Sequence, residues 1–315
     1  MICFDLLHST EVSFSGLPET VLALGNFDGV HLGHRALLDE AVRCAEMLSE
    51  NGEPVFPGIW LFRVPPSDLM RSPKTPHLSA LEDKFEAFRA SGIRYAFLGE
   101  FEALATLSPH DFAVRILKES CRCRHAVCGF NYTFGHKGAG TPAMLRTYFD
   151  GAVSVVEPVL YGDLPVSSTR IRARLAEGNV KEAAALLGRP YTLRTPVLHG
   201  KALGRTLSFP TANQKFPENA VIPKSGIYAV EVLTPDNILH YGVANVGLRP
   251  TVEHSDEVNC ETFIFDFSGD LYGSVIEVRF IERLRDERKM SGIEELRATI
   301  QSDTENARRI FGLAP

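Results

Sequence analysis

The stretch VLALGNFDGVHLGH, residues 21–34, joins an apolar run, a glycine-rich loop and two closely spaced histidines. The apolar run predicts a buried strand, and the loop after it predicts the start of a helix. Backbone N–H groups at a helix start bind phosphate, because the first turn leaves them without partners. His31 and His34 lie on neighbouring faces of that turn. The segment therefore predicts a nucleotide site whose imidazoles stabilise charge on a phosphate under attack.

Strand-like and helix-like segments alternate through the first half of the chain. Apolar runs predict strands over residues 20–24, 55–62, 95–98, 125–128 and 153–156, and helical periodicity predicts helices over residues 32–49, 79–90 and 109–120. Strands that alternate with helices imply βαβ units and a parallel sheet. We therefore expect a Rossmann-like α/β domain over residues 1–187. Its segment GNFDGVHLGH (25–34) resembles the HxGH signature of the nucleotidyltransferase superfamily, which implies a nucleotidyltransferase domain.

The pattern changes near Gly188, where the helical segments between strands end. Strand-like runs separated by proline, glycine and asparagine cover residues 192–198, 226–232, 241–246, 260–267 and 275–281. This pattern predicts an antiparallel barrel or sandwich over residues 188–315. A closing helix over residues 293–311 carries an apolar stripe that we expect to be buried, formed by Ile293, Leu296, Ile300, Ala307 and Ile310.

Composition narrows the class of protein. A chain of 315 residues with 44% hydrophobic residues suits two soluble domains. The net charge of −6 argues against sequence-independent nucleic-acid binding, which needs a basic face. The six cysteines are too few for a disulfide framework and are expected to be reduced. Neither a signal peptide nor an apolar run of about 18 residues is evident, so we expect a cytoplasmic protein. The oligomeric state stays open.

The segment VSSTRIR, residues 166–172, places hydroxyl groups just before a helical run. Ser167, Ser168 or Thr169 is suited to cap that helix, and Arg170 and Arg172 are suited to reach phosphate oxygens. The alternative is a plain helix cap with solvated arginines. A second glycine-rich loop, residues 129–138, contains Asn131 and is suited to hold an adenine or ribose edge.

The second domain contains the segment GRTLSFPTAN, residues 204–213. Thr211 and Asn213 are two residues apart, so in an extended segment they point to the same side and offer oxygen ligands for Mg²⁺. The alternative is a polar turn. Glu261 lies within an apolar strand, where a carboxylate is costly unless it has a partner or a task. It is suited to accept a hydroxyl proton, and the alternative is an outward-facing strand residue.

A cluster of cysteines and one histidine offers a competing interpretation of the first half. Cys121, Cys123, His125 and Cys128 include residue types that bind zinc. Their spacing is irregular, and residues 125–128 form a strand whose side chains alternate between faces. Ordinary thiols are therefore expected.

The whole chain resembles the bacterial bifunctional riboflavin kinase/FAD synthetase family. In the first half the likeness is carried by GNFDGVHLGH (25–34), LEDKFEAFRASGI (81–93), GFNYTFGHKGAG (129–140), SSTRIR (167–172) and LLGRPY (186–191). In the second half it is carried by GRTLSFPTAN (204–213), GIYAVEV (226–232), GVANVGLRPT (242–251), NCETFIFDF (259–267) and LRDERK (284–289).

The resemblance implies two reactions that use ATP and Mg²⁺. The C-terminal barrel would phosphorylate riboflavin to FMN, and the N-terminal domain would transfer AMP to FMN, giving FAD and pyrophosphate. Motif matching implies that Thr211 and Asn213 bind Mg²⁺–ATP, that Glu261 is the base, and that His31 and His34 stabilise adenylyl transfer. The implied ATP and phosphate contacts are Gly25, Phe27, Asp28, Gly29, Asn131, Ser168, Thr169, Arg172, Gly204, Thr211 and Asn213.

The sequence departs from the family pattern at two positions. Pro65 stands where the family usually has a histidine after its second strand, and Ser208 stands where glycine is usual. The first departure motivates an alternative, a flavokinase whose N-terminal domain binds nucleotide with little or no turnover. A nucleotidyltransferase acting on another phosphate is a further alternative, against which the PTAN segment argues.

Overall fold

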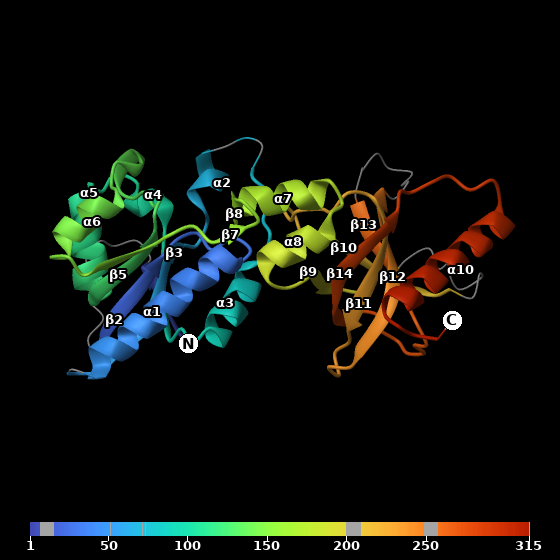
Figure 1. Cartoon of the computed structure of the whole chain (residues 1–315), viewed down its shortest axis with the longest axis horizontal. Coiled ribbons are helices and arrows are strands. Elements are labelled where there is room, and N and C mark those ends of the chain that lie inside the picture. The colour runs from blue at the N-terminus through green and yellow to red at the C-terminus, as the bar shows by residue number, and fades with distance from the viewer. Residues whose placement is uncertain are drawn as a thin grey trace. The chain divides into compact units, whose positions relative to one another are not determined.

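The computed structural model describes two compact units, Met1–Ser167 and Ser168–Pro315 (Figure 1). The described residues are 1–6, 16–50, 52–70, 72, 74–199, 209–248 and 258–314. In the described part of each unit the main sheet has six strands. Gly204 and Ser208 lie outside the described residues.

The first unit contains a fully parallel sheet, as predicted. Its strand order is β1 (Ile2–Leu6), β4 (Tyr95–Gly99), β3 (Val55–Phe62), β2 (Glu19–Leu24), β5 (Cys123–Gly129) and β6 (Val153–Val156). Chain order reverses at β2, which has β3 on one side and β5 on the other. In open α/β sheets, ligands bind beyond the carboxyl ends of the strands at such a reversal.

Helices cover both faces of this sheet. Helices α1 (Leu32–Glu50) and α3 (Leu81–Ala90) share a core with Val21 and Ala23. On the other face, Leu22 and Leu24 pack against the π-helical segment η1 (Phe112–Ser120) and α6 (Pro142–Tyr148). Successive residues of β2 are thus buried on opposite faces, which explains its continuous apolar run.

Shorter elements connect these strands and helices. They are α2 (Pro66–Met70), α4 (Phe101–Leu104), α5 (Pro109–Asp111), η2 (His136–Gly138) and the hairpin of β7 (Leu160–Tyr161) and β8 (Leu164–Pro165). The helix predicted over residues 109–120 is α5 followed by η1, with Ser108 capping its start by accepting a hydrogen bond from the Asp111 N–H.

The second unit begins with α7 (Ser168–Ala176) and α8 (Val180–Leu187) and continues into an antiparallel sheet. The strand order is β10 (Thr211–Lys215), β13 (Val258–Ile264), β12 (Leu239–Leu248), β11 (Gly226–Leu233), β14 (Val275–Arg285) and β9 (Tyr191–Pro196). Leu198, just after β9, bridges to Asn213 on β10, so the sheet curls back on itself as a barrel does. This unit begins before Gly188, and the domain boundary at 187/188 stays a prediction.

The sheet of the second unit is buried on both faces over much of its area. Tyr228, Val230 and Val232 are fully buried inside the curl. Ile227 and Ala229 point the other way and share a core with Ala307 of helix α10 (Ile293–Ile310). The predicted alternation of the strands therefore fits a curled sheet closed by a C-terminal helix.

The apolar stripe predicted on α10 is buried only in part. Ala307 is fully buried and Leu296 and Ile300 are half-buried, whereas Ile293 is 67% exposed and Ile310 is 37% exposed. The buried residues of the helix are Thr299, Asp303, Thr304 and Ala307. A polar face can be buried here because its groups are paired, most clearly where Asp303 accepts two hydrogen bonds from the Arg285 guanidinium, at 2.9 and 2.7 Å.

Candidate active sites

The loop between β2 and α1 has an unusual backbone. Phe27, Gly29 and Val30 have φ values of 52°, 84° and 41°. Left-handed conformations are uncommon outside glycine and costly for a β-branched residue such as Val30. The side chains of Phe27 and Val30 are almost completely buried, which holds the loop in this shape. Such strain gathers at ligand sites, in agreement with the expectation that residues 25–29 form a phosphate loop.

His31 and His34 lie together at the start of α1. Their rings stack with centroids 3.7 Å apart and an angle of 15° between planes. The His34 backbone N–H donates to His31 Nδ1 at 3.3 Å, which satisfies one N–H of the first turn. A Cβ on Gly33 would lie 3.2 Å from His31 Cε1, so glycine lets the ring lie close to the helix.

The environment of His34 favours the neutral imidazole. Its pKa is lowered well below 6.5, first by burial and then by the positive charges of His31 and Lys84. Its Nδ1 is buried and has no hydrogen-bond partner among the described residues. Buried polar atoms are nearly always hydrogen-bonded, so this nitrogen indicates a ligand contact.

Residues beyond the quoted motif hold the loop in place. Asp28 Oδ1 accepts a hydrogen bond from the Leu78 N–H at 2.9 Å, and the Gly29 N–H donates to Ser79 Oγ at 3.1 Å. Asp28 therefore anchors the loop, whatever its role toward phosphate. Lys84 donates to the Asn26 carbonyl at 3.3 Å and is only 5% exposed. The sequence did not single out Lys84, although a lysine on the apolar face of α3 is a recognisable signal.

The other predicted contacts of the first site belong to different elements of the fold. Asn131 is exposed in the turn after β5, the strand beside β2, so its turn starts from the same edge of the sheet. The Val166 carbonyl lies 3.7 Å from a Cβ placed on Gly33. Ser168, Thr169 and Arg172 belong to the start of α7, in the second unit. Their contact with ATP stays a prediction.

Arg170 differs from its predicted role as a phosphate contact. Its guanidinium forms an ion pair with Glu182 at 2.8 Å, with both side chains partly buried. This pair ties α7 to α8. The structure therefore shows Arg170 in the packing of the two helices rather than solvated, as the alternative interpretation had it. A contact of Arg170 with phosphate stays a prediction.

The second site lies on one row of the antiparallel sheet. Asn213 on β10 is directly opposite Glu261 on β13, so both side chains are on the same face. Thr211, two residues earlier, shares that face. The Asn213 side-chain N–H donates to the Thr211 carbonyl at 3.1 Å, which leaves the amide oxygen to face a ligand. The register thus joins residues that are 48 positions apart in the sequence.

Asn245 extends this row and was not predicted. On β12 it is directly opposite Glu261, on the side away from Asn213. Its Oδ1 is buried and has no hydrogen-bond partner among the described residues. A polar residue within an apolar strand is common, so the sequence alone does not single out Asn245. The strand register does, because it pairs Asn245 with Glu261.

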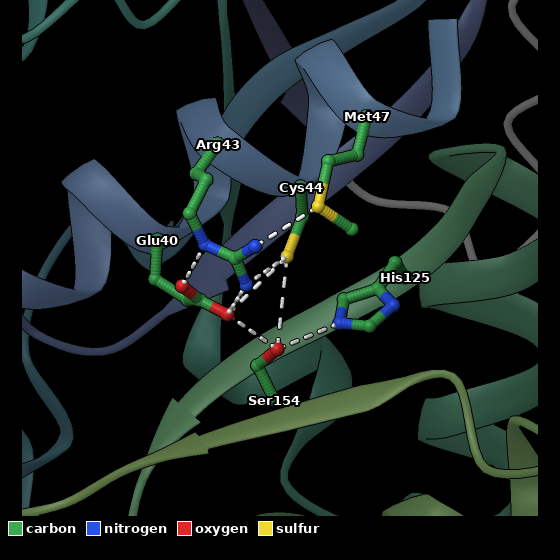
Figure 2. A network of polar contacts seen from close by, with 6 residues as sticks. All are labelled: Glu40, Arg43, Cys44, Met47, His125 and Ser154. Atoms are coloured by element: carbon green, nitrogen blue, oxygen red, sulfur yellow. Dashed lines mark hydrogen bonds and ion pairs between the residues drawn. The ribbon is translucent and has the colours of Figure 1, made fainter. Parts of the chain in front are cut away.

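The cysteine–histidine cluster does not converge on a metal. Among the described residues, no three His, Cys, Asp or Glu side chains are placed to hold an ion. Figure 2 shows His125 directed at Ser154, 3.0 Å away, in a network with Glu40, Arg43 and Cys44 of α1.

The thiols of this region are buried, and burial disfavours the thiolate form that reacts. Burial raises the pKa of Cys123 to about 12 and that of Cys128 to about 11. All six cysteines are free, and of the six only Cys3 is exposed. That the thiols are reduced stays a prediction.

Two family models match the chain, one over most of the first unit and one within the second. The model described as FAD synthetase matches residues 15–170, and the model described as riboflavin kinase matches residues 187–311. Together they define a two-part transferase of nucleotidyl and phosphoryl groups.

Curated relatives match along nearly the whole length. A bifunctional riboflavin kinase/FMN adenylyltransferase of Bacillus subtilis is 35% identical over 300 residues, covering 93% of each chain. Its namesake in Escherichia coli is 35% identical over 304 residues, again covering 93% of each. The chain belongs to the bifunctional riboflavin kinase/FMN adenylyltransferase family.

A solved structure has the same fold throughout. A Streptococcus pneumoniae protein described as a macrolide-efflux protein matches with a TM-score of 0.87 and 31% identity. The match covers 98% of this chain and 99% of that one. Within the described residues, no helix is both long enough and apolar enough to span a membrane.

Proposed function

We propose that the chain makes FMN from riboflavin and FAD from FMN, using one ATP for each step. The proposal rests on family membership over nearly the whole length and on one structural observation in each unit. Residues far apart in the second half, Asn213 and Glu261, are directly opposite each other, and in the first half His31 and His34 stack at a phosphate-binding helix start.

The kinase step is assigned to the face that carries Thr211, Asn213 and Glu261. A ribityl hydroxyl has a high pKa, so its attack on the γ-phosphate of ATP gains from a carboxylate that accepts its proton. Glu261 has this role. The proton moves from the hydroxyl to Glu261, the new bond joins the hydroxyl oxygen to the γ-phosphorus, and ADP leaves.

The Thr211 and Asn213 side chains suit Mg²⁺, which prefers hard oxygen ligands. One hydroxyl and one amide oxygen share a face with the Glu261 carboxylate, and Mg²⁺ usually keeps waters and phosphate oxygens as its remaining ligands. When bound, the ion neutralises charge on the phosphates of ATP. The protein residues orient the nucleotide and hold the base.

The adenylyltransferase step is assigned to residues 25–34. The phosphate of FMN is already a nucleophile, so the site has to align it with the α-phosphate of ATP and stabilise the charge that develops there. Neutral His34, His31 and the α1 start supply hydrogen-bond donors, and Lys84 supplies positive charge. The expected products are FAD and pyrophosphate.

The test is incubation of the purified chain with ATP and Mg²⁺ and either riboflavin or FMN, followed by chromatography. Riboflavin should yield FMN and then FAD, and FMN should yield FAD with one pyrophosphate per turnover. FMN formation without any pyrophosphate release from added FMN would support the alternative, a flavokinase with an inactive first domain.

A further inference from the structure

A histidine outside the predicted site is tied to the nucleotide loop. The segment that follows β3 returns to residues 28 and 29 through the hydrogen bonds from Leu78 to Asp28 and from Gly29 to Ser79. His77 directly precedes these two anchors. The backbone of His77 therefore lies beside the loop between β2 and α1, which follows the carboxyl end of β2.

The ring of His77 is held by a nearly buried carboxylate. His77 Nε2 lies 2.5 Å from Asp68 Oδ2, on the short helix α2 that follows β3. The other oxygen, Asp68 Oδ1, accepts from Ser67 Oγ at 3.3 Å. The Asp68 side chain is 8% exposed, whereas the His77 side chain is 26% exposed. The carboxylate thus faces inward, and the imidazole keeps an accessible edge.

This arrangement resembles the way proteins orient a working imidazole. A carboxylate on one ring nitrogen fixes the orientation and leaves the opposite nitrogen to face a ligand. The contact with Asp68 occupies Nε2 of the His77 ring. With both ring nitrogens protonated, Nε2–H donates to the Asp68 carboxylate and Nδ1–H can donate to a phosphate oxygen, of which a site for ATP and FMN gathers several.

We propose that His77 binds a substrate phosphate oxygen in the adenylyltransferase site and that Asp68 is its positioning residue. This inference rests on the proposed function. The phosphate belongs either to ATP or to FMN, and the kinetic experiment below separates the two sources. The competing explanation is a structural clamp, in which the pair only fastens the segment after β3 to the loop.

Two substitutions separate binding from clamping. His77→Asn places an amide near the position of Nδ1, facing the substrate, whereas His77→Gln places one near Nε2, facing Asp68. If His77 binds phosphate, kcat/KM for FAD formation should fall by about tenfold to a hundredfold in His77→Gln, as expected for a lost hydrogen bond to a charged group. His77→Asn should retain more activity than His77→Gln, and Asp68→Ala should lower kcat/KM with His77 still present.

The two-activity chain supplies its own control. FMN formation from riboflavin should stay within twofold in every variant, which shows that the second unit is folded. Circular dichroism and the urea midpoint should match wild type, which shows the same for the first unit. His110→Gln is a matched control, because His110 also contacts an aspartate but is 63% exposed. A raised KM for ATP at saturating FMN identifies the ATP phosphates as the partner, and a raised KM for FMN at saturating ATP identifies the FMN phosphate.

Each of the following results would overturn the inference. FAD formation within twofold of wild type in both His77 variants would exclude a substrate contact. Full activity in His77→Gln with loss in His77→Asn would establish the clamp. If wild type forms no FAD, this inference falls with the proposed function. If wild type forms FAD and only the His31 and His34 variants lose it, the proposed function stands and the inference alone fails.

Discussion

Each functional side chain depends on a small number of local interactions. Glu261 and Asn213 share a face because they are paired directly opposite each other on antiparallel strands. A slip of one residue in this register would turn the two side chains to opposite faces. Burial, followed by the neighbouring His31 and Lys84, lowers the pKa of His34. Motifs identified His34 and Glu261. Asn245 became visible only through the strand register, and the role of Lys84 only through its hydrogen bond to the loop.

The lowered pKa of His34 gives a testable prediction. By NMR titration its ring should stay neutral at pH 6, and adding a non-hydrolysable ATP analogue should raise its pKa, because phosphate charge favours the imidazolium. An His34 ring that gains its proton near pH 6.5 without nucleotide would contradict the described environment.

The same shift predicts how stability depends on pH. A lowered pKa means that the folded chain binds fewer protons than the unfolded chain as pH falls. The stability that neutral His34 contributes is therefore complete above 6.5 and is lost as pH drops below that value. Unfolding by urea at pH 7.5 and pH 5.5 should show a smaller loss of stability on acidification in His34→Gln than in wild type. An equal or larger loss would contradict it.

At the level of elements, most strands and helices follow from the apolar runs and the helical periodicity of the sequence. Strand β3 and helix α1 form where the apolar run and the helical period predict them. Strand β1 was missed, because Asp5 interrupts its short apolar run. The stripe on α10 is only partly buried, because periodicity counts apolar residues, while much of the buried face of this helix is polar and Asp303 on it pairs with Arg285 of β14.

That pairing predicts where α10 gains its stability. Asp303→Asn removes the charge from a nearly buried bidentate contact with Arg285 and should lower the free energy of unfolding of the second unit by about 1–3 kcal/mol. Urea denaturation followed by circular dichroism measures it. Glu305→Gln, an exposed carboxylate on the same helix, should change stability by less than about 0.5 kcal/mol. Equal effects of the two changes would show that burial of the pair adds nothing.

At the scale of the whole molecule, the chain contains two sites of different chemistry on two sheets of different topology. The parallel sheet places a helix start beyond its central strand, and the antiparallel sheet places Glu261, the proposed base, in one row with Asn213 and Asn245. The sequence motifs predicted residues at both places. Residues 200–208, which include Gly204, and residues 249–257 lie outside the described residues.

Two sites on separate units predict complementation between variants. A mixture of Glu261→Gln chains with chains carrying both His31→Ala and His34→Ala should convert riboflavin to FAD, because FMN released by one chain can be used by the other. Each variant alone should fail to make FAD from riboflavin. A mixture that forms FMN without FAD would show that FMN does not pass between chains.

The most direct measurement is the rate of each half-reaction in the two site variants. Glu261→Gln should lower FMN formation by about 10²–10⁴-fold and leave FAD formation from added FMN unchanged. The double change at His31 and His34 should lower FAD formation by at least about 10²-fold and leave FMN formation unchanged. Loss of both activities to the same extent in either folded variant would contradict the assignment of two independent sites.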